Sequence, residues 1–134
     1  MKPSMLDTDI LSEFFRGNPK VIEKVDEYLG EFGFISISII TYYEVLNGLL
    51  YKDAKKQLTR FEEFVALNAV IPLTLPMAKI AASIQADLRT KGTEIGHTDT
   101  LIAGIAINSE LRLVTNNTDH FKRIKDLEIA NWMK

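Results

Sequence analysis

Three acidic residues far apart in the chain, Asp7, Glu44 and Asp99, each stand at or near the expected start of a helix. If the fold brings them together, two carboxylates about 4 Å apart repel by about 4 kcal/mol at an effective dielectric near 20. Three such pairs would rival the whole stability of a small domain, about 5–15 kcal/mol. Protonation or a bound divalent cation must relieve this repulsion, and oxygen ligands suit a hard cation. The three acids therefore indicate metal-assisted chemistry.

Strand-like and helix-like segments alternate along the chain, which is typical of a parallel sheet with helices on both faces. The clearest strand is 34–40, whose first half alternates and is β-branched. Strands are also expected at 5–6, 70–73, 111–115 and 127–130, and helices at 10–15, 18–30, 41–50, 53–67, 76–91 and 98–106. Pro72 has no N–H to donate, so the strand at 70–73 is expected at an edge. The small residues at 102–106 predict a helix packed tightly against the sheet.

This topology brings several of the polar residues to one edge of the sheet. Right-handed crossovers place the carboxyl ends of all parallel strands on that edge, where ligands bind in such folds. Asp7 ends the first strand, Glu44 lies just past the second, and the strand at 111–115 delivers Asn117 and Asp119. Asp99 begins a helix instead, so the topology alone does not place it there.

Each acid also has a purely structural interpretation. Thr41 and Glu44 have the spacing of a capping box, with Thr41 at the N-cap. Asp7 and Asp9 could cap the first helix, and Asp99 could complement a helix dipole. The structural and chemical interpretations are compatible, because the partial positive charge of helix N-termini eases the crowding of carboxylates.

Composition fits one globular domain, residues 1–134, with 46% hydrophobic and 25% charged residues. A net charge of −2 argues against a strongly basic nucleic-acid coat, although basic clusters at 52–60 and 122–125 leave a nucleic-acid substrate open. The chain has no cysteine and no apolar run of membrane-spanning length, so a cytoplasmic location without membrane contact is expected. His97 and His120 lack the spacing of a zinc-ligand pair, although His97 could meet a phosphate at the rim of the site.

The segments that carry these residues resemble the PIN-domain ribonucleases, and most closely the VapC toxins of prokaryotic toxin–antitoxin pairs. The matching segments are MLDTDI at 5–10, ISIITYYEVLNG at 37–48, IGHTDTLIAGIA at 95–106, LVTNNTDHFKRI at 113–124, and the terminal Leu127…Asn131-Trp132. The resemblance implies an α/β fold, a PIN-like three-layer sandwich with a central, mostly parallel sheet of four to five strands. It also implies an endoribonuclease that depends on Mg²⁺ or Mn²⁺, with Asp7, Glu44 and Asp99 as catalytic and metal-binding acids.

The chain departs from the family pattern at one position. A fourth acid often follows the Thr of the fourth strand by two residues, and here that position is Asn117. Asn117 is expected to act in the site as a neutral oxygen ligand, so a second metal would bind more weakly. Asp119 could compensate, although the family pattern does not place an acid there, and Asp9 could restore negative charge nearby. Whether one or two metals bind stays open.

The resemblance also implies partners. Similar proteins act on RNA, often tRNA or ribosomal RNA, are inhibited by a small antitoxin protein encoded beside them, and usually form homodimers. An antitoxin is expected to insert a basic side chain into the acidic pocket and to cover nearby apolar surface. Candidate contacts are Phe14, Phe15, Tyr42 and Leu46, for which core packing is the alternative.

Two other functions remain open from the sequence. The D-x-D pattern of Asp7-Thr8-Asp9 also occurs after the first strand of haloacid-dehalogenase-like phosphotransferases, although Leu11 and the absence of a downstream G-D-x-x-D motif argue against that class. Alternatively, the chain is a catalytically silent binding module whose acids only cap helices. Saturable Mn²⁺ binding that Asp99→Asn abolishes would separate a nuclease from the silent module.

Overall fold

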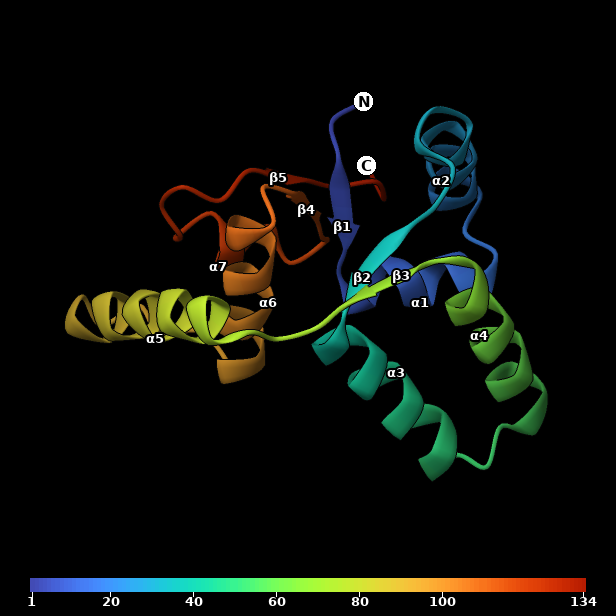
Figure 1. Ribbon diagram of the computed structural model, residues 1–134, viewed down its shortest axis with the longest axis horizontal. Coiled ribbons are helices and arrows are strands. Elements are labelled where there is room, and N and C mark those ends of the chain that lie inside the picture. The colour runs from blue at the N-terminus through green and yellow to red at the C-terminus, as the bar shows by residue number, and fades with distance from the viewer.

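The computed structural model describes all of residues 1–134 as a five-stranded parallel sheet flanked by helices, in the strand order β3-β2-β1-β4-β5 (Figure 1). The strands are β1 (Ser4–Leu6), β2 (Ser36–Ser38), β3 (Ala69–Ile71), β4 (Arg112–Val114) and β5 (Ile129–Ala130). The helices are α1 (Thr8–Arg16), α2 (Pro19–Phe32), α3 (Ile39–Tyr51), α4 (Lys55–Leu67), α5 (Leu75–Thr90), α6 (His97–Asn108) and α7 (Thr118–Phe121). None of these helices combines the length and hydrophobicity that crossing a bilayer requires.

The sheet separates two hydrophobic clusters because successive side chains of a strand point to opposite faces. Met5 of β1 belongs to the cluster beneath α5, α6 and α7, whereas the next residue, Leu6, belongs to the cluster beneath α1, α2 and α4. Leu113 and Val114 of β4 divide in the same way. Figure 1 shows the two sets of helices on opposite sides of the strands. The predicted α/β three-layer sandwich is therefore confirmed, with all five strands parallel.

The start of α3 differs from the prediction in a way that matters for the site. The β-branched run at 34–40 forms a strand only over Ser36–Ser38, and Ile39 is already helical. Ser38 is the N-cap, because its hydroxyl oxygen accepts a hydrogen bond from the backbone N–H of Thr41 at 3.0 Å. Thr41 therefore lies in the first turn and is not the N-cap, so the predicted capping box with Glu44 is wrong. The carboxylate of Glu44 remains available for another role.

The edge position predicted for the third strand is confirmed, since β3 pairs only with β2. The strand itself is shifted to Ala69–Ile71, and Pro72 lies just beyond its end. The short helix α7 was not predicted, because the segment TDHF has no apolar periodicity.

The small residues of α6 let it approach α5 closely as well as the sheet. Ile102, Ala103 and Ala106 of α6 share a cluster with Met5 of the sheet. At Gly104, an added Cβ atom would lie 2.6 Å from the backbone oxygen of Met77 on α5. The absence of a side chain at Gly104 therefore sets the distance between the two helices.

We expect Gly104→Ala to lower the free energy of unfolding by about 1–3 kcal/mol, because overpacking against a backbone atom outweighs the better helix propensity of alanine. Gly30→Ala in α2 is the matched control, since nothing lies within 4 Å of its added Cβ atom. The control should gain up to about 1 kcal/mol from helix propensity alone. Urea unfolding of the three proteins measures both changes, and equal stabilisation by both substitutions would contradict the close approach.

Candidate active site

Asp7 lies where β1 ends and α1 begins, at the carboxyl edge of the sheet. Its backbone N–H donates to the carbonyl oxygen of Val114 at 2.9 Å, which extends the pairing of β1 with β4. Its side chain is held at both oxygens: Oδ1 accepts from the backbone N–H of Thr8 at 2.8 Å, and Oδ2 accepts from the hydroxyl of Thr115 at 2.7 Å. Asp7 is only 6% exposed. A carboxylate in this position is fixed by β1, α1 and β4 together.

The electrostatic environment of Asp7 is unfavourable for its charged form. Burial raises the pKa of Asp7 to about 7, and the neighbouring carboxylates of Asp9 and Asp99 raise it as well. The hydrogen bonds from Thr115 and Thr8 oppose this effect without cancelling it. Burial also raises the pKa of Asp9, with a smaller contribution from Asp99. Asp7, Asp9 and Asp99 therefore form a group of like charges that the protein alone does not neutralise.

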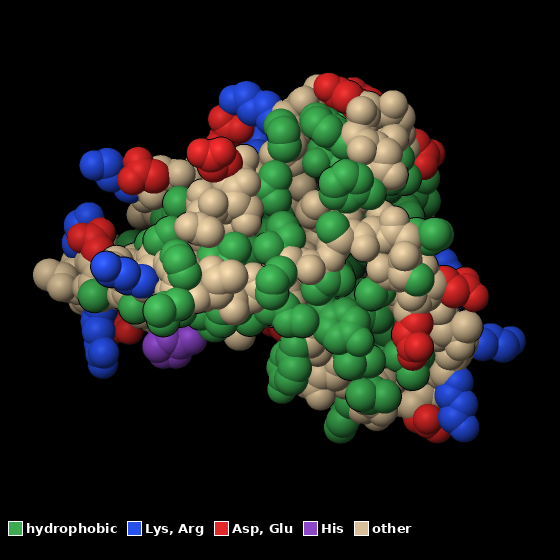
Figure 2. Space-filling view, in the orientation of Figure 1, with side chains coloured by type: hydrophobic (Ala, Val, Ile, Leu, Met, Phe, Trp, Pro, Cys, Tyr) green, Lys and Arg blue, Asp and Glu red, His purple; other side chains and the backbone are tan.

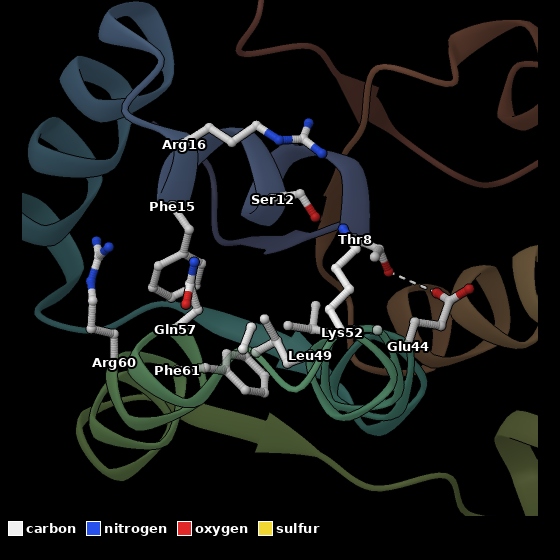
Figure 3. A pocket seen from close by; sticks show the side chains of 13 residues that line it. Thr8, Ser12, Phe15, Arg16, Glu44, Leu49, Lys52, Gln57, Arg60 and Phe61 are labelled. Atoms are coloured by element: carbon white, nitrogen blue, oxygen red, sulfur yellow. Dashed lines mark hydrogen bonds between the residues drawn. The ribbon is translucent and has the colours of Figure 1, made fainter.

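Glu44 reaches the same region through Thr8. Its Oε1 atom accepts a hydrogen bond from the Thr8 hydroxyl at 2.7 Å (Figure 3). The hydroxyl oxygens of Thr8 and Thr41 lie 3.1 Å apart. Thr8 directly follows Asp7, so Glu44 is one residue removed from the buried acid. The middle of α3 thus supplies the second predicted acid, and Thr8 and Glu44 both line a groove between α1, α3 and α4.

Asp99 and Asn117 are joined by a histidine. The Nδ1 atom of His120 lies 2.9 Å from Nδ2 of Asn117 and 3.4 Å from Oδ2 of Asp99. The backbone N–H of Asn117 donates to the Thr115 hydroxyl at 3.0 Å, and that hydroxyl donates to Asp7. A continuous chain of polar contacts therefore runs from Asp7 through Thr115, Asn117 and His120 to Asp99.

Two acids near this chain have different surroundings. Asp9 accepts hydrogen bonds from the backbone N–H of Ile10 at 2.7 Å and of Asn116 at 3.0 Å, so it fastens α1 to the segment after β4. Asp119 instead pairs with Lys122 at 3.3 Å, and its side chain is 84% exposed. Asp9, rather than Asp119, contributes its charge to the surroundings of Asp7.

Two residues of this region, Asp9 and His120, lie outside the predicted set of site residues. The D-x-D spacing places Asp9 in the first turn of α1, close after Asp7. The separation of three residues between Asn117 and His120 puts their side chains on one face of a helical turn. For both, the spacing was the available signal.

No group of three or more His, Cys, Asp or Glu side chains is arranged to hold a metal ion as these side chains stand. The Glu44 carboxylate accepts a hydrogen bond from the Thr8 hydroxyl, and the Asp99 carboxylate contacts the His120 ring. The chemistry of the donors nevertheless fits a divalent cation, because carboxylate oxygens are the ligands that hard cations take. Burial and the nearby carboxylates of Asp9 and Asp99 raise the pKa of Asp7, and a bound cation would favour its charged form.

The PIN domain family model matches residues 4–127 of the chain. The chain therefore belongs to the PIN domain family. Among its relatives, Ribonuclease VapC2 of Rickettsia felis is 32% identical and the alignment covers 97% of this chain and 98% of that protein. The tRNA(fMet)-specific endonuclease VapC of Shigella flexneri is 30% identical, with 96% of each chain covered.

Solved structures of VapBC complexes contain chains with the same fold as this protein. VapBC2 of Rickettsia felis bound to a promoter DNA fragment contains a chain with a TM-score of 0.86 and 30% identity, covering 96% of this chain and 98% of that chain. DNA-bound VapBC of Salmonella typhimurium gives a TM-score of 0.87 and 30% identity, with 98% and 99% of the two chains covered. The resemblance to VapC proteins that the sequence indicated is confirmed.

Proposed function

We propose that this chain is an endoribonuclease that cleaves RNA phosphodiester bonds with bound Mg²⁺ or Mn²⁺, and that it is the toxin of a VapBC-type module. The observation that carries the proposal is the buried carboxylate of Asp7, whose pKa is raised to about 7 by burial and by neighbouring acids. Two relatives that match nearly the whole chain are named as a ribonuclease and as a tRNA-specific endonuclease. Residues 1–134 act as one domain in this proposal, in the cytoplasm.

The proposed reaction is an in-line hydrolysis. When bound, the cation supplies positive charge that offsets the charge of the phosphate and lowers the pKa of water. Asp7 and Asp99 would hold this cation, while Glu44 completes its coordination or accepts the proton of the attacking water. Thr115 keeps the Asp7 carboxylate in one orientation through its hydrogen bond at 2.7 Å. Asn117 would add a neutral oxygen.

The RNA substrate is proposed to be tRNA or ribosomal RNA, as the name of the Shigella flexneri relative suggests for tRNA. Incubation of the purified protein with total RNA, with Mg²⁺ and with EDTA, followed by sequencing of the new ends, tests both the activity and the substrate. We expect cuts at a few positions that disappear in EDTA. Intact RNA in Mg²⁺ and Mn²⁺ would favour the silent binding module.

We also propose an antitoxin protein as partner, docked in a groove that leads to Glu44. The groove has a volume of about 480 Å³ and lies between α1, α3 and α4 (Figure 3). Apolar side chains form part of its lining, and three cationic side chains, Arg16, Lys52 and Arg60, surround it. An amphipathic segment with acidic side chains would complement this lining. Solved relatives are titled as VapBC complexes.

The predicted antitoxin contacts differ in their suitability for such docking. Phe15 lines the groove, with the Arg60 guanidinium 5.9 Å from the centre of its ring. Phe14, Tyr42 and Leu46 pack against the core cluster beneath α1, α2 and α4 and do not line the groove. Core packing is thus the main role of these three.

Reversing charge in the groove should weaken antitoxin binding. We expect the double variant Lys52→Glu/Arg60→Glu to bind the small protein encoded beside this chain at least about tenfold less tightly, because like charges would face the acidic segment. Lys79→Glu on the exposed surface of α5, outside the groove, is the control with the same kind of charge change. Titration calorimetry measures all three affinities. Unchanged antitoxin affinity with weakened RNA binding would instead assign the groove to the substrate.

A homodimer is the last part of the proposal. Exposed apolar side chains occur on α3, at Ile39 and Tyr43, at Leu73 in the connection from β3 to α5, and at Leu75, the first residue of α5. Figure 2 shows hydrophobic side chains gathered over this part of the face. Such a patch is typical of an interface between protein chains. Sedimentation equilibrium of the purified chain would show a monomer mass if this proposal is wrong.

A further inference from the structure

We propose that His120 is a positioning residue that orients the side-chain amide of Asn117, so that the amide oxygen, and not the amide nitrogen, is offered as a ligand to the bound cation. This inference rests on the proposed function, because it concerns the same acidic site. It assigns a role to a histidine that the proposed mechanism leaves unused.

The Nδ1 atom of His120 has a single hydrogen-bonding position. A neutral imidazole nitrogen carries either one proton or one lone pair, so it cannot accept from one neighbour and donate to another. Nδ1 lies 2.9 Å from the Asn117 amide nitrogen, within the usual range of a hydrogen bond, and 3.4 Å from Asp99 Oδ2, beyond that range. In the proposed arrangement the shorter contact takes the lone pair of Nδ1, so His120 accepts a hydrogen from Asn117 and carries its own proton on Nε2.

This hydrogen bond fixes which end of the Asn117 amide faces His120. With its nitrogen bonded to His120, its Oδ1 atom makes no hydrogen bond within the protein. The backbone of Asn117 is held as well, since its N–H donates to the Thr115 hydroxyl that also binds Asp7. Asn117 is therefore held both at its backbone N–H and at its amide nitrogen. The Thr115 hydroxyl is the single group that links Asn117 to Asp7 in this chain of contacts.

An orienting residue is needed here because of the amide. A carboxylate offers an oxygen whichever way it turns, whereas an asparagine turned the wrong way offers an N–H₂ group, which a cation repels. Removal of a residue that orients a metal ligand through a hydrogen bond is expected to change metal affinity about 10–100-fold. With an aspartate at position 117 the same residue would have nothing to orient.

The first test needs no metal. Long-range ¹H–¹⁵N spectra of the cation-free protein at pH 8 report which ring nitrogen of His120 carries the proton. We expect the proton on Nε2, with Nδ1 shifted as an acceptor. A proton on Nδ1 would overturn the proposal, because Asn117 would then have to turn its oxygen toward the ring. This measurement stands even if the protein cleaves no RNA.

The second test measures Mn²⁺ affinity by titration calorimetry. His120→Ala should weaken binding about tenfold, whereas His120→Asn, whose oxygen can accept from Asn117 at the place of Nδ1, should retain most of it. Asp119→Ala on the same short helix is the control, since Asp119 is exposed and pairs only with Lys122. In the Asn117→Asp background, His120→Ala should leave the affinity unchanged or raise it. An equal loss in both backgrounds would show a merely structural role. Absence of Mn²⁺ binding in the unmodified protein would instead contradict the proposed function.

Discussion

Asp7→Asn should reduce RNA cleavage at least about a thousandfold, a loss of about 4 kcal/mol in transition-state stabilisation. Asn keeps one side-chain oxygen to accept from the backbone N–H of Thr8, and its amide nitrogen can donate to the hydroxyl oxygen of Thr115, which donates to Asp7 in the unmodified protein. The side chain therefore stays in place. It lacks the negative charge that holds the cation, and the cation supplies most of the charge stabilisation in the proposed reaction. Initial cleavage rates of an RNA identified from the total-RNA digestion, in excess Mg²⁺, measure the effect.

The matched control is Asp119→Asn, which makes the same chemical change at an exposed acid after β4. It should cleave at the unmodified rate, and a large loss would restore Asp119 as a candidate ligand. Wild-type-like cleavage by Asp7→Asn in a preparation free of other nucleases would end the assignment of Asp7 to the catalytic machinery.

The second large effect is on stability, and its sign follows from the raised pKa. The pKa of Asp7 rises from 3.8 to about 7 on folding, mainly because burial disfavours the charged form. Below about pH 4 the carboxyl group is protonated in both states and costs nothing. Between about pH 4 and pH 7 the unfolded chain releases the proton while the folded chain keeps it, so the stability contribution falls as pH rises. Above pH 7 the full cost, about 4 kcal/mol, opposes folding.

Asp7→Asn removes this cost. In EDTA at pH 8 the variant should gain about 2–4 kcal/mol in the free energy of unfolding, and at pH 4 it should gain little. Urea unfolding at the two pH values measures the difference, with Asp119→Asn expected to change neither. Mg²⁺ should stabilise the unmodified protein more at pH 8 than at pH 5, because protons compete with the cation for the carboxylate. Equal gains at pH 4 and pH 8 would show that charge at Asp7 is not the cause.

Prediction from sequence was most accurate where side chains report local geometry. The helix after Asn18-Pro19 could be predicted because an N-cap and a proline at the first helical position act over a few residues. The strand before Asp7 has no β-branched residue, and its signal was the apolar pair Met5-Leu6 directly before Asp7. Prediction was least accurate at Ile39, which looks like a strand residue but is helical. There, the hydroxyl of Ser38 caps the helix three residues earlier than the pattern of Thr41 and Glu44 suggested.

Some features of the site could be predicted from the sequence and others could not. Asp7 at the end of a strand could be predicted, since the carboxyl edge of a parallel sheet is where ligands bind. The burial that raises its pKa could not, because it depends on β1 lying between β2 and β4 and on α1 covering its end. Nor could the hydrogen bond from Thr8 to Glu44, because it depends on how α3 packs against α1.

The sequence by itself determined the identities and the order of the acids, the alternation of strands and helices, and the amide at position 117, because these depend only on residue type and neighbouring residues. Only the tertiary structure decided that Asp9 is a neighbour in charge to Asp7, that Asp119 is exposed to solvent, and that His120 lies between Asn117 and Asp99. The physical reason is that burial and contacts between distant residues arise from packing, which local propensities do not encode.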